Sequence, residues 1–189
     1  LCTVYWLEDC LEEQKMRPPW LAYHFPCAYD IDQVKRNGPL KTHVISLHGF
    51  YGKQKLILKT MIWLLNGIYT STLSNINSIL ISNKDESFNS LSTTNSNTDI
   101  KLKMAKKWNV KILNGCWLME LYLGNSFAFN NKLNEKLLDT RYTNLNIENH
   151  FAFDRLLVSD FIQPWKKLIK LPESLIKKVQ QDLPFKSSL

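Results

Sequence analysis

The sequence predicts an α/β fold with a small, mainly parallel central sheet flanked by helices. Three observations support this prediction. The 189 residues are 44% hydrophobic and 22% charged, which is typical of a packed domain and excludes wholesale disorder. Between residues 43 and 125, apolar runs of strand length alternate with segments whose apolar residues recur every three or four positions. The order strand, helix, strand, strand, helix, strand, helix favours parallel strands with helices on both faces.

The first half of this region predicts three strands and one helix. Residues 43–50, HVISLHGF, form a β-branched and apolar run that closes on a glycine, as a buried strand does before a turn. Residues 53–66 carry apolar side chains at helical spacing and end in an Asn-Gly pair, which is a helix stop signal. Short strands are expected at 68–70 and 78–82.

The second half begins with a polar insertion. Residues 83–98 are mostly Asn, Ser, Thr and acids, which predicts a solvated loop. Residues 100–108 follow as a short basic helix, 110–113 as a strand, and 116–123 as a helix that a Gly-Asn pair ends. The segment 42–125 is therefore expected to be one complete α/β unit.

The N-terminal residues are predicted to belong to a truncated preceding copy of this unit. Residues 1–16 combine a strand end over 1–4 with an amphipathic helix that begins near Trp6 and is stopped by two prolines. A strand followed by Trp, Leu and an acidic residue also closes the main unit, at Trp117. Since the chain starts without methionine, we expect it to be a piece of something larger.

Two further segments join or extend the unit. Residues 17–41 have prolines and glycine but no sustained period, which indicates an ordered linker held by Trp20, Tyr23 and Phe25. Residues 126–189 are expected to form a partly helical C-terminal extension, with helices over 153–162 and near 175–179. Its apolar face either packs across the domain or a neighbour, which we favour, or the segment is a basic docking site for a partner or DNA.

Composition narrows the function classes. Twenty-four Lys and Arg against 17 Asp and Glu give a net charge of +7, which favours acidic partners such as phosphates, nucleic acid or acidic peptides. The four cysteines form no CxxC pair or zinc-finger spacing, so we expect reduced intracellular thiols, no metal and no cofactor. No apolar run reaches the length of a membrane helix. No catalytic motif is present either, and we do not expect an enzyme.

Several of these features together resemble the BRCT domain family, notably repeats of multi-BRCT checkpoint scaffolds. They are the run HVISLHGF, the Asn66-Gly67 turn, the strand SILIS and the stretch KMAKKWNVKILNGCWL, which is the most specific. The resemblance covers 42–125 well, 1–16 as a partial repeat, and hardly anything after Asn144. The family's Thr-His pair in the third strand is replaced by Ser78-Ile79.

This resemblance implies a site for a phosphorylated Ser or Thr. Such a site uses a hydroxyl and a backbone N–H at the end of the first strand and a lysine at the start of the second helix. Matched onto this chain, the backbone donor is Gly49, the lysine is Lys101, and the hydroxyl position is occupied by His48, whose imidazole can donate one hydrogen bond. Ser46 shares the strand face of His48, and Lys103 is the substitute lysine if the register differs.

The function implied by the resemblance is that of a nuclear, non-enzymatic scaffold module. It would bind a phosphorylated protein or peptide in DNA-damage or replication-checkpoint signalling, beside neighbouring BRCT repeats of the same chain. Two alternatives stay open: direct DNA binding through the basic helix and tail, and a purely architectural repeat. We assign Lys106 and Lys107 to a solvated helix face.

Overall fold

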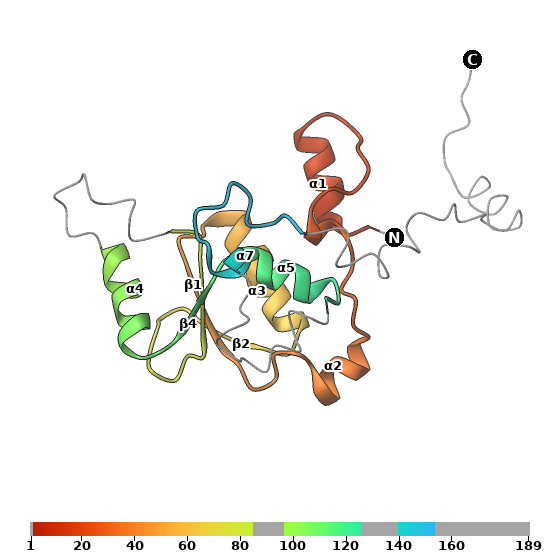
Figure 1. Ribbon diagram of the computed structural model, residues 1–189. Coiled ribbons are helices and arrows are strands. Elements are labelled where there is room, and N and C mark those ends of the chain that lie inside the picture. The colour runs from red at the N-terminus through yellow and green to blue at the C-terminus, as the bar shows by residue number, and fades with distance from the viewer. Residues whose placement is uncertain (1, 85–96, 126–139, 154–189) are drawn as a thin grey trace, which may run out of the picture.

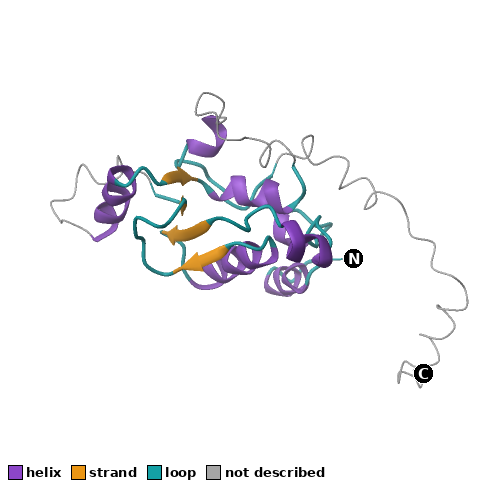
Figure 2. Cartoon of the chain, turned by 90° about the horizontal axis from the view of Figure 1, so that it is seen from below, coloured by secondary structure: helices purple, strands orange, loops and turns teal. Residues whose placement is uncertain are grey.

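The sheet at the centre of the molecule contains four strands, and all of them run parallel. This computed structural model describes residues 2–84, 97–125 and 140–153. The strand order is β2-β1-β3-β4. Figures 1 and 2 show the sheet lying between the helices. The strands are β1 (Val44–His48), β2 (Ile68–Thr70), β3 (Ile79–Ser82) and β4 (Lys111–Leu113). The predicted α/β fold with a parallel sheet is confirmed.

Three helices cover the two faces of the sheet. Helices α3 (Gly52–Leu64) and α5 (Gly115–Tyr122) lie on one face, and α4 (Asn97–Lys107) lies on the other (Figure 1). Alternation along β3 divides its side chains between two cores, because successive residues of a strand point to opposite faces. Ile79 and Ile81 pack in the core of α3 and α5, whereas Leu80 packs against the inner face of α4.

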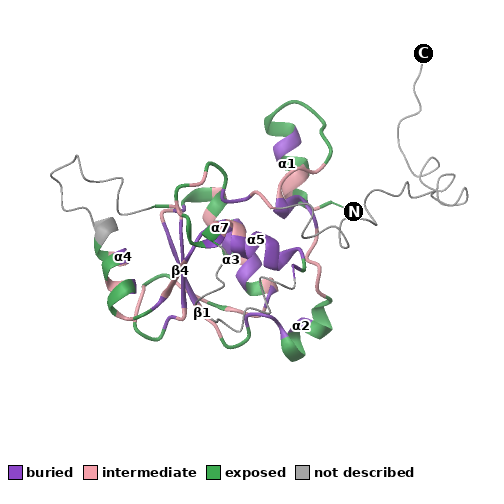
Figure 3. Cartoon of the chain, viewed as in Figure 1, coloured by how far each residue is buried: buried purple, intermediate pink, exposed green. Residues whose placement is uncertain are grey.

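Burial on both faces explains why the strands read as continuous apolar runs. Strands β1 and β3 and helix α5 are the most buried elements, whereas β2 at the edge of the sheet and the outer faces of the peripheral helices are more exposed (Figure 3). In β1 four of the five residues are buried. A strand covered on both sides carries mostly apolar side chains on both faces, which removes the alternation of a half-exposed strand. Ser46 and His48 are buried polar exceptions in β1.

The Asn-Gly pair after α3 ends the helix, as predicted, but the two residues have different roles. Asn66, with φ of 65°, adopts the left-handed conformation that ends the helix. Gly67 is required for a different reason: a Cβ at this position would lie 2.9 Å from Cγ2 of Ile62 and 3.0 Å from Cβ of Leu40. The glycine therefore permits close packing of the chain, and the asparagine makes the turn.

The N-terminal segment departs from the prediction in two ways. The strand end expected over 1–4 is wrong, since helix α1 (Val4–Glu12) begins there and the N–H of Thr3 donates to the carbonyl of His24 at 3.0 Å. The linker contains two helices that were not predicted, namely the 3-10 helix η1 (Ala22–His24) and α2 (Ile31–Asn37). Helix α2 is too short to show a period, but its N-cap Asp30, which accepts from the N–H of Asp32, is a recognisable signal.

Residues 140–153, here called the C-terminal strap, return to the domain after α5. The strap begins with the short helix α7 (Thr140–Thr143). Its Tyr142 carbonyl accepts from the N–H of Asn114 at 2.8 Å, and the carbonyl of Phe151 accepts from the N–H of Ala22 at 3.3 Å. The strap therefore joins the start of α5 to η1. This part of the extension packs on the domain, while the helices predicted over 153–162 and near 175–179 lie outside the described residues, apart from Phe153.

A buried carboxylate anchors the strap. Glu120 of α5 is 1% exposed, and its side chain accepts hydrogen bonds from the Tyr142 hydroxyl and from Nδ2 of Asn125 at 2.7 Å. Arg141 lies 3.5 Å from the other carboxylate oxygen. Because a buried charge is costly unless it is paired and hydrogen-bonded, these contacts explain how an acid is tolerated inside the apolar helix CWLMELYL.

Candidate functional site

The end of β1 and the start of α4 meet at one edge of the sheet. The Lys101 ammonium donates to the carbonyl of Leu47 at 2.8 Å and lies 3.5 Å from the carbonyl of Ser71. Leu47 precedes Gly49 by two residues, so the lysine and the glycine lie at the same end of β1. We call the region formed by His48, Gly49, the first turn of α3 and Lys101 the anion notch.

Only glycine fits at position 49. Its φ of +81° is a conformation that L side chains rarely adopt, and an added Cβ would lie 1.8 Å from Oδ1 of Asn83. The Asn83 amide thus lies directly against the backbone of the notch. Its Oδ1 is buried and accepts no hydrogen bond from any residue that the structure describes.

The first turn of α3 supplies backbone donors to the notch. The first N–H groups of a helix have no partner within the helix, and the helix dipole favours a negative charge there. The N-cap residue, Tyr51, makes no side-chain hydrogen bond that would satisfy them. The start of α3 is therefore suited to an anion, as the end of β1 leads the chain directly into this turn.

Lys101 is held in an electropositive setting. Burial, and to a smaller extent the positive charge of Lys55 on α3, lower the pKa of Lys101. An anion placed between these two side chains would relieve their repulsion. Beside Lys101 lies an open pocket of about 370 Å³, whose lining includes Leu73, Ile100 and Trp108.

The other predicted site residues are placed less favourably. His48 is 7% exposed, and Ser46 is completely buried within β1. The Ser46 hydroxyl has no hydrogen-bond partner in the described part of the chain, but it is closed off from solvent. Lys103 is exposed and, two residues after Lys101 on a helix, points to nearly the opposite side of α4. Lys106 and Lys107 are also exposed.

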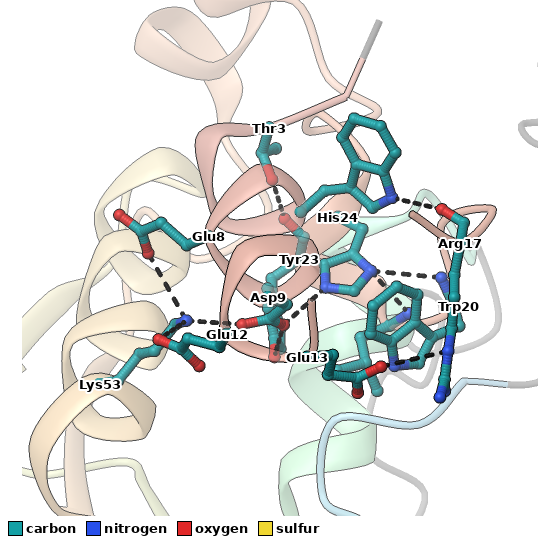
Figure 4. Close-up of polar contacts among 12 residues, drawn as sticks. Thr3, Glu8, Asp9, Glu12, Glu13, Arg17, Trp20, Tyr23, His24 and Lys53 are labelled. Atoms are coloured by element: carbon teal, nitrogen blue, oxygen red, sulfur yellow. Dashed lines mark hydrogen bonds and ion pairs between the residues drawn. The ribbon is translucent and has the colours of Figure 1, made fainter. Parts of the chain in front are cut away.

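A second polar cluster, which the sequence did not reveal, surrounds Asp9 of α1 (Figure 4). Its carboxylate accepts from the Tyr23 hydroxyl at 2.7 Å, from Nε2 of His24 at 2.8 Å and from the Lys53 ammonium at 2.5 Å. Glu12 adds a 3.2 Å contact to Lys53. We call these five residues the α1 clamp, because they tie α1 to η1 and to the first turn of α3.

The proton positions in the clamp follow from its hydrogen bonds. Nδ1 of His24 accepts from the backbone N–H groups of Trp20 and Leu21, so the ring is neutral and its Nε2–H donates to Asp9. Burial lowers the pKa of His24, although Asp9 partly opposes this. For Asp9, burial alone would raise the pKa, but the hydrogen bonds from Lys53, His24 and Tyr23 together lower it. The clamp is thus a carboxylate with three donors.

The clamp has the geometry of a structural contact. Asp9 and its aromatic partners are buried, and no serine or cysteine is hydrogen-bonded to His24 in the described residues. Lys53 is the lysine nearest the notch in sequence, yet it is committed to Asp9, Glu12 and Glu8. Lys101, with Lys55 beside it, is therefore available for an anion in the notch. Among the described residues, no cluster of His, Cys, Asp or Glu could hold a metal ion, and no helix could cross a membrane.

A third histidine gives the domain an expected pH dependence. Burial lowers the pKa of His150 to about 4, and its Nδ1 accepts from the N–H of Gly115 at 3.2 Å. Unfolded histidine binds its proton near 6.5, so acid favours the unfolded state between these two values. We expect urea denaturation to show a free energy of unfolding lower by about 1–2 kcal/mol at pH 5 than at pH 7. His150→Asn keeps an acceptor and should have a smaller pH dependence; an unchanged one would contradict this role.

Comparison with known proteins places the fold in a family. The profile of the BRCA1 C Terminus (BRCT) domain matches residues 35–122. The chain is 29% identical to PAX-interacting protein 1 of Bos taurus over 178 residues, which are 94% of this chain and 16% of that protein. It is 26% identical to Regulator of Ty1 transposition protein 107 of Saccharomyces cerevisiae over 120 residues, or 60% of this chain and 9% of that protein. The solved S. pombe Rad4 BRCT3,4 is 25% identical, with a TM-score of 0.46 over 62% of this chain and 58% of that one.

These matches also correct one expectation. The BRCT profile ends at residue 122, as expected for the domain itself. The likeness to PAX-interacting protein 1 covers 94% of the chain and extends past Asn144, so for that protein the expectation that the likeness hardly continues beyond this residue is wrong. The chain spans about one sixth of the length of PAX-interacting protein 1. The match to the BRCT profile spans all four parallel strands, which have the order β2-β1-β3-β4, so residues 35–122 of this chain are similar to a BRCT domain in both sequence and fold.

Proposed function

We propose that this chain is a non-enzymatic interaction module that binds a phosphorylated segment of a partner protein in the anion notch. The observation that carries the proposal is the contact of Lys101 with the end of β1. This contact sets the Lys101 ammonium at the end of β1 that leads through Gly49 into the uncapped start of α3, and the proposal is that all three groups bind one phosphate. A phosphate group gains from each of these, because charge-assisted hydrogen bonds are roughly twice as strong as neutral ones.

His48 takes the place of the hydroxyl that such a site normally uses. Its imidazole is nearly buried, so the phosphate would depend mainly on Lys101 and on backbone N–H groups. We therefore propose weaker binding of the phosphate itself, with more of the affinity coming from the residues that flank it. The open pocket beside Lys101 offers an apolar surface for one of them.

The wider role is proposed from the family and its members. PAX-interacting protein 1 is named for its interaction with another protein, and one solved structure contains yeast Rtt107 together with Mms22. We propose that this chain likewise brings partner proteins together, in the nucleus and in DNA-damage or checkpoint signalling, next to other BRCT repeats. The α1 clamp supports a fixed arrangement of α1 and this domain.

Lys101→Met tests the phosphate site. An array of phosphopeptides and their unphosphorylated forms identifies a binding peptide, and fluorescence anisotropy then gives its affinity. We expect at least a tenfold loss of affinity for the phosphorylated form in Lys101→Met, because a charged hydrogen bond is worth about 1.5–3 kcal/mol. Lys103→Met is the matched control and should bind as the unaltered chain does. Equal affinity for both peptide forms, or a loss confined to Lys103→Met, would contradict the proposal.

DNA binding is the second candidate, favoured by the exposed lysines of α4 and the charge of +7. Phosphate contacts to DNA release counterions, so such an affinity would fall steeply as salt rises and would ignore peptide competitors. Combined replacement of Lys103, Lys106 and Lys107 would weaken it, whereas Lys101→Met alone would have a small effect.

A further inference from the structure

A polar pocket lies beside the anion notch, between the start of α3 and the C-terminal strap. Its volume is about 260 Å³, and its lining includes Phe50, Gln54 and Asn83 of the domain with Glu148 and His150 of the strap. The pocket adjoins the notch directly, because Phe50 follows Gly49 and the Asn83 amide lies against the Gly49 backbone. A peptide with its phosphate in the notch would therefore have this pocket next to it.

Two groups of this pocket, the Asn83 amide oxygen and the Glu148 carboxylate, are hydrogen-bond acceptors. Asn83 Oδ1 is buried without a hydrogen-bond partner in the described residues, and a buried acceptor left in this state costs free energy. Glu148 adds a carboxylate, while no lysine or arginine is among the described residues that line the pocket. Among its described lining residues the site therefore lacks a positively charged donor, although the amide groups of Gln54 and Asn149 can donate.

We propose that the pocket receives an arginine side chain of the bound phosphopeptide. This inference rests on the proposed function and adds a sequence preference to it. A guanidinium group presents several N–H donors in one plane, which can pair with the Glu148 carboxylate. The buried Asn83 oxygen becomes a second acceptor when its side chain turns from the Gly49 backbone towards the pocket. Its flat face can also stack on an aromatic ring, and Phe50 and His150 both line the pocket. The volume suits a single long side chain rather than a whole small molecule.

The pairing also complements the notch. The notch holds a cation, Lys101, for the phosphate, and the pocket beside it holds an anion, Glu148, for the arginine. A peptide with a phosphorylated residue and a nearby arginine would match both charges, whereas an acidic residue in the pocket would face Glu148. This arrangement gives specificity, since mismatched charges are penalised more strongly than matched ones are rewarded.

The test uses the whole 189-residue chain and phosphopeptides in which one arginine is moved along the positions on either side of the phosphorylated residue. At one position, arginine should bind about tenfold more tightly than citrulline, its uncharged analogue, in fluorescence anisotropy. Glu148→Gln and Asn83→Leu should each remove most of this preference, and Glu13→Gln, the same change of charge on α1, should keep it. Equal affinities for arginine and citrulline at every position, with the Lys101 effect retained, would overturn the pocket alone.

A second measurement does not depend on phosphate. N-acetylarginine amide should shift the NMR signals of the His150 ring, its citrulline analogue should shift them much less, and Glu148→Gln should reduce the arginine effect. If no phosphopeptide binds but this selectivity is seen, the proposed phosphate site is wrong and the pocket stands. If the two small molecules act alike in the unaltered chain, the pocket proposal is wrong, whatever the phosphopeptides do. A circular dichroism spectrum shows whether Asn83→Leu is folded, and Glu148→Gln changes only an exposed residue.

Discussion

Asp9→Ala is expected to lower the free energy of unfolding by about 3–5 kcal/mol, because breaking a buried ion pair leaves its partners uncompensated. The carboxylate is 12% exposed and accepts from Tyr23, His24 and Lys53. Removing it leaves a buried hydroxyl and a buried imidazole N–H without their acceptor, and each such group costs about 1–3 kcal/mol. Urea denaturation at pH 7 measures the loss.

The control for this prediction is a neighbour on the same helix. Glu12 also contacts Lys53, at 3.2 Å, but its side chain is 69% exposed. Exposed ion pairs contribute about 0–1 kcal/mol, so Glu12→Ala should change stability little. The loss of stability in Asp9→Asn should lie between the losses in Asp9→Ala and Glu12→Ala, since asparagine keeps one acceptor oxygen but has no charge. Similar losses for Asp9→Ala and Glu12→Ala would show that α1 is not held by the buried carboxylate.

Gly49→Ala should lower stability by about 2–4 kcal/mol and also abolish peptide binding. The left-handed backbone costs an alanine about 1 kcal/mol, and the overlap with Asn83 Oδ1 adds a packing cost of about 1–3 kcal/mol. Relief of this overlap requires the Asn83 side chain or the end of β1 to move, and both border the notch. Thermal unfolding and fluorescence anisotropy measure the two effects.

Gly52→Ala separates backbone strain from crowding. Gly52 also has a positive φ, +51°, but an added Cβ there meets no atom within 4 Å. Its replacement should therefore cost only about 1 kcal/mol, without a clash at the notch. If both alanine variants lose the same stability and bind alike, crowding at Gly49 has no role in the notch.

The sheet and its helices could be predicted because their causes are local. A strand buried on both faces is mostly apolar along its whole length, and the apolar residues of an amphipathic helix recur every three or four positions. The family resemblance added Gly49 and Lys101, which lie at the same end of β1. Their assignment as a phosphate site stays a prediction. Ser46 was included because it shares a strand face with His48, but face alone does not say whether that face is open to solvent.

The missed features depend on contacts between distant segments. Asp9 is one of several acids in α1, and nothing near it in sequence shows that Tyr23 and Lys53 will enclose it. The polar pocket beside the notch combines Asn83 with Glu148 and His150 of the strap. Asn83 is far from these two residues in the chain, and they meet only because the strap folds back on the domain. Helix α2 was missed because seven residues give too few turns for a period.

The C-terminal strap enlarges the unit that folds cooperatively, so that this unit extends beyond the sheet and the helices that cover it. Asn114 caps α5 through the N–H of Trp117 and also donates to the carbonyls of Arg141 and Asn144, so one side chain secures two segments. His150 in turn accepts from the first N–H of α5. A version of this domain transplanted into another protein with its boundary at the end of α5 would lose partners at the start of that helix. The strap therefore has to be included when the domain is transplanted, even though it adds no strand to the sheet.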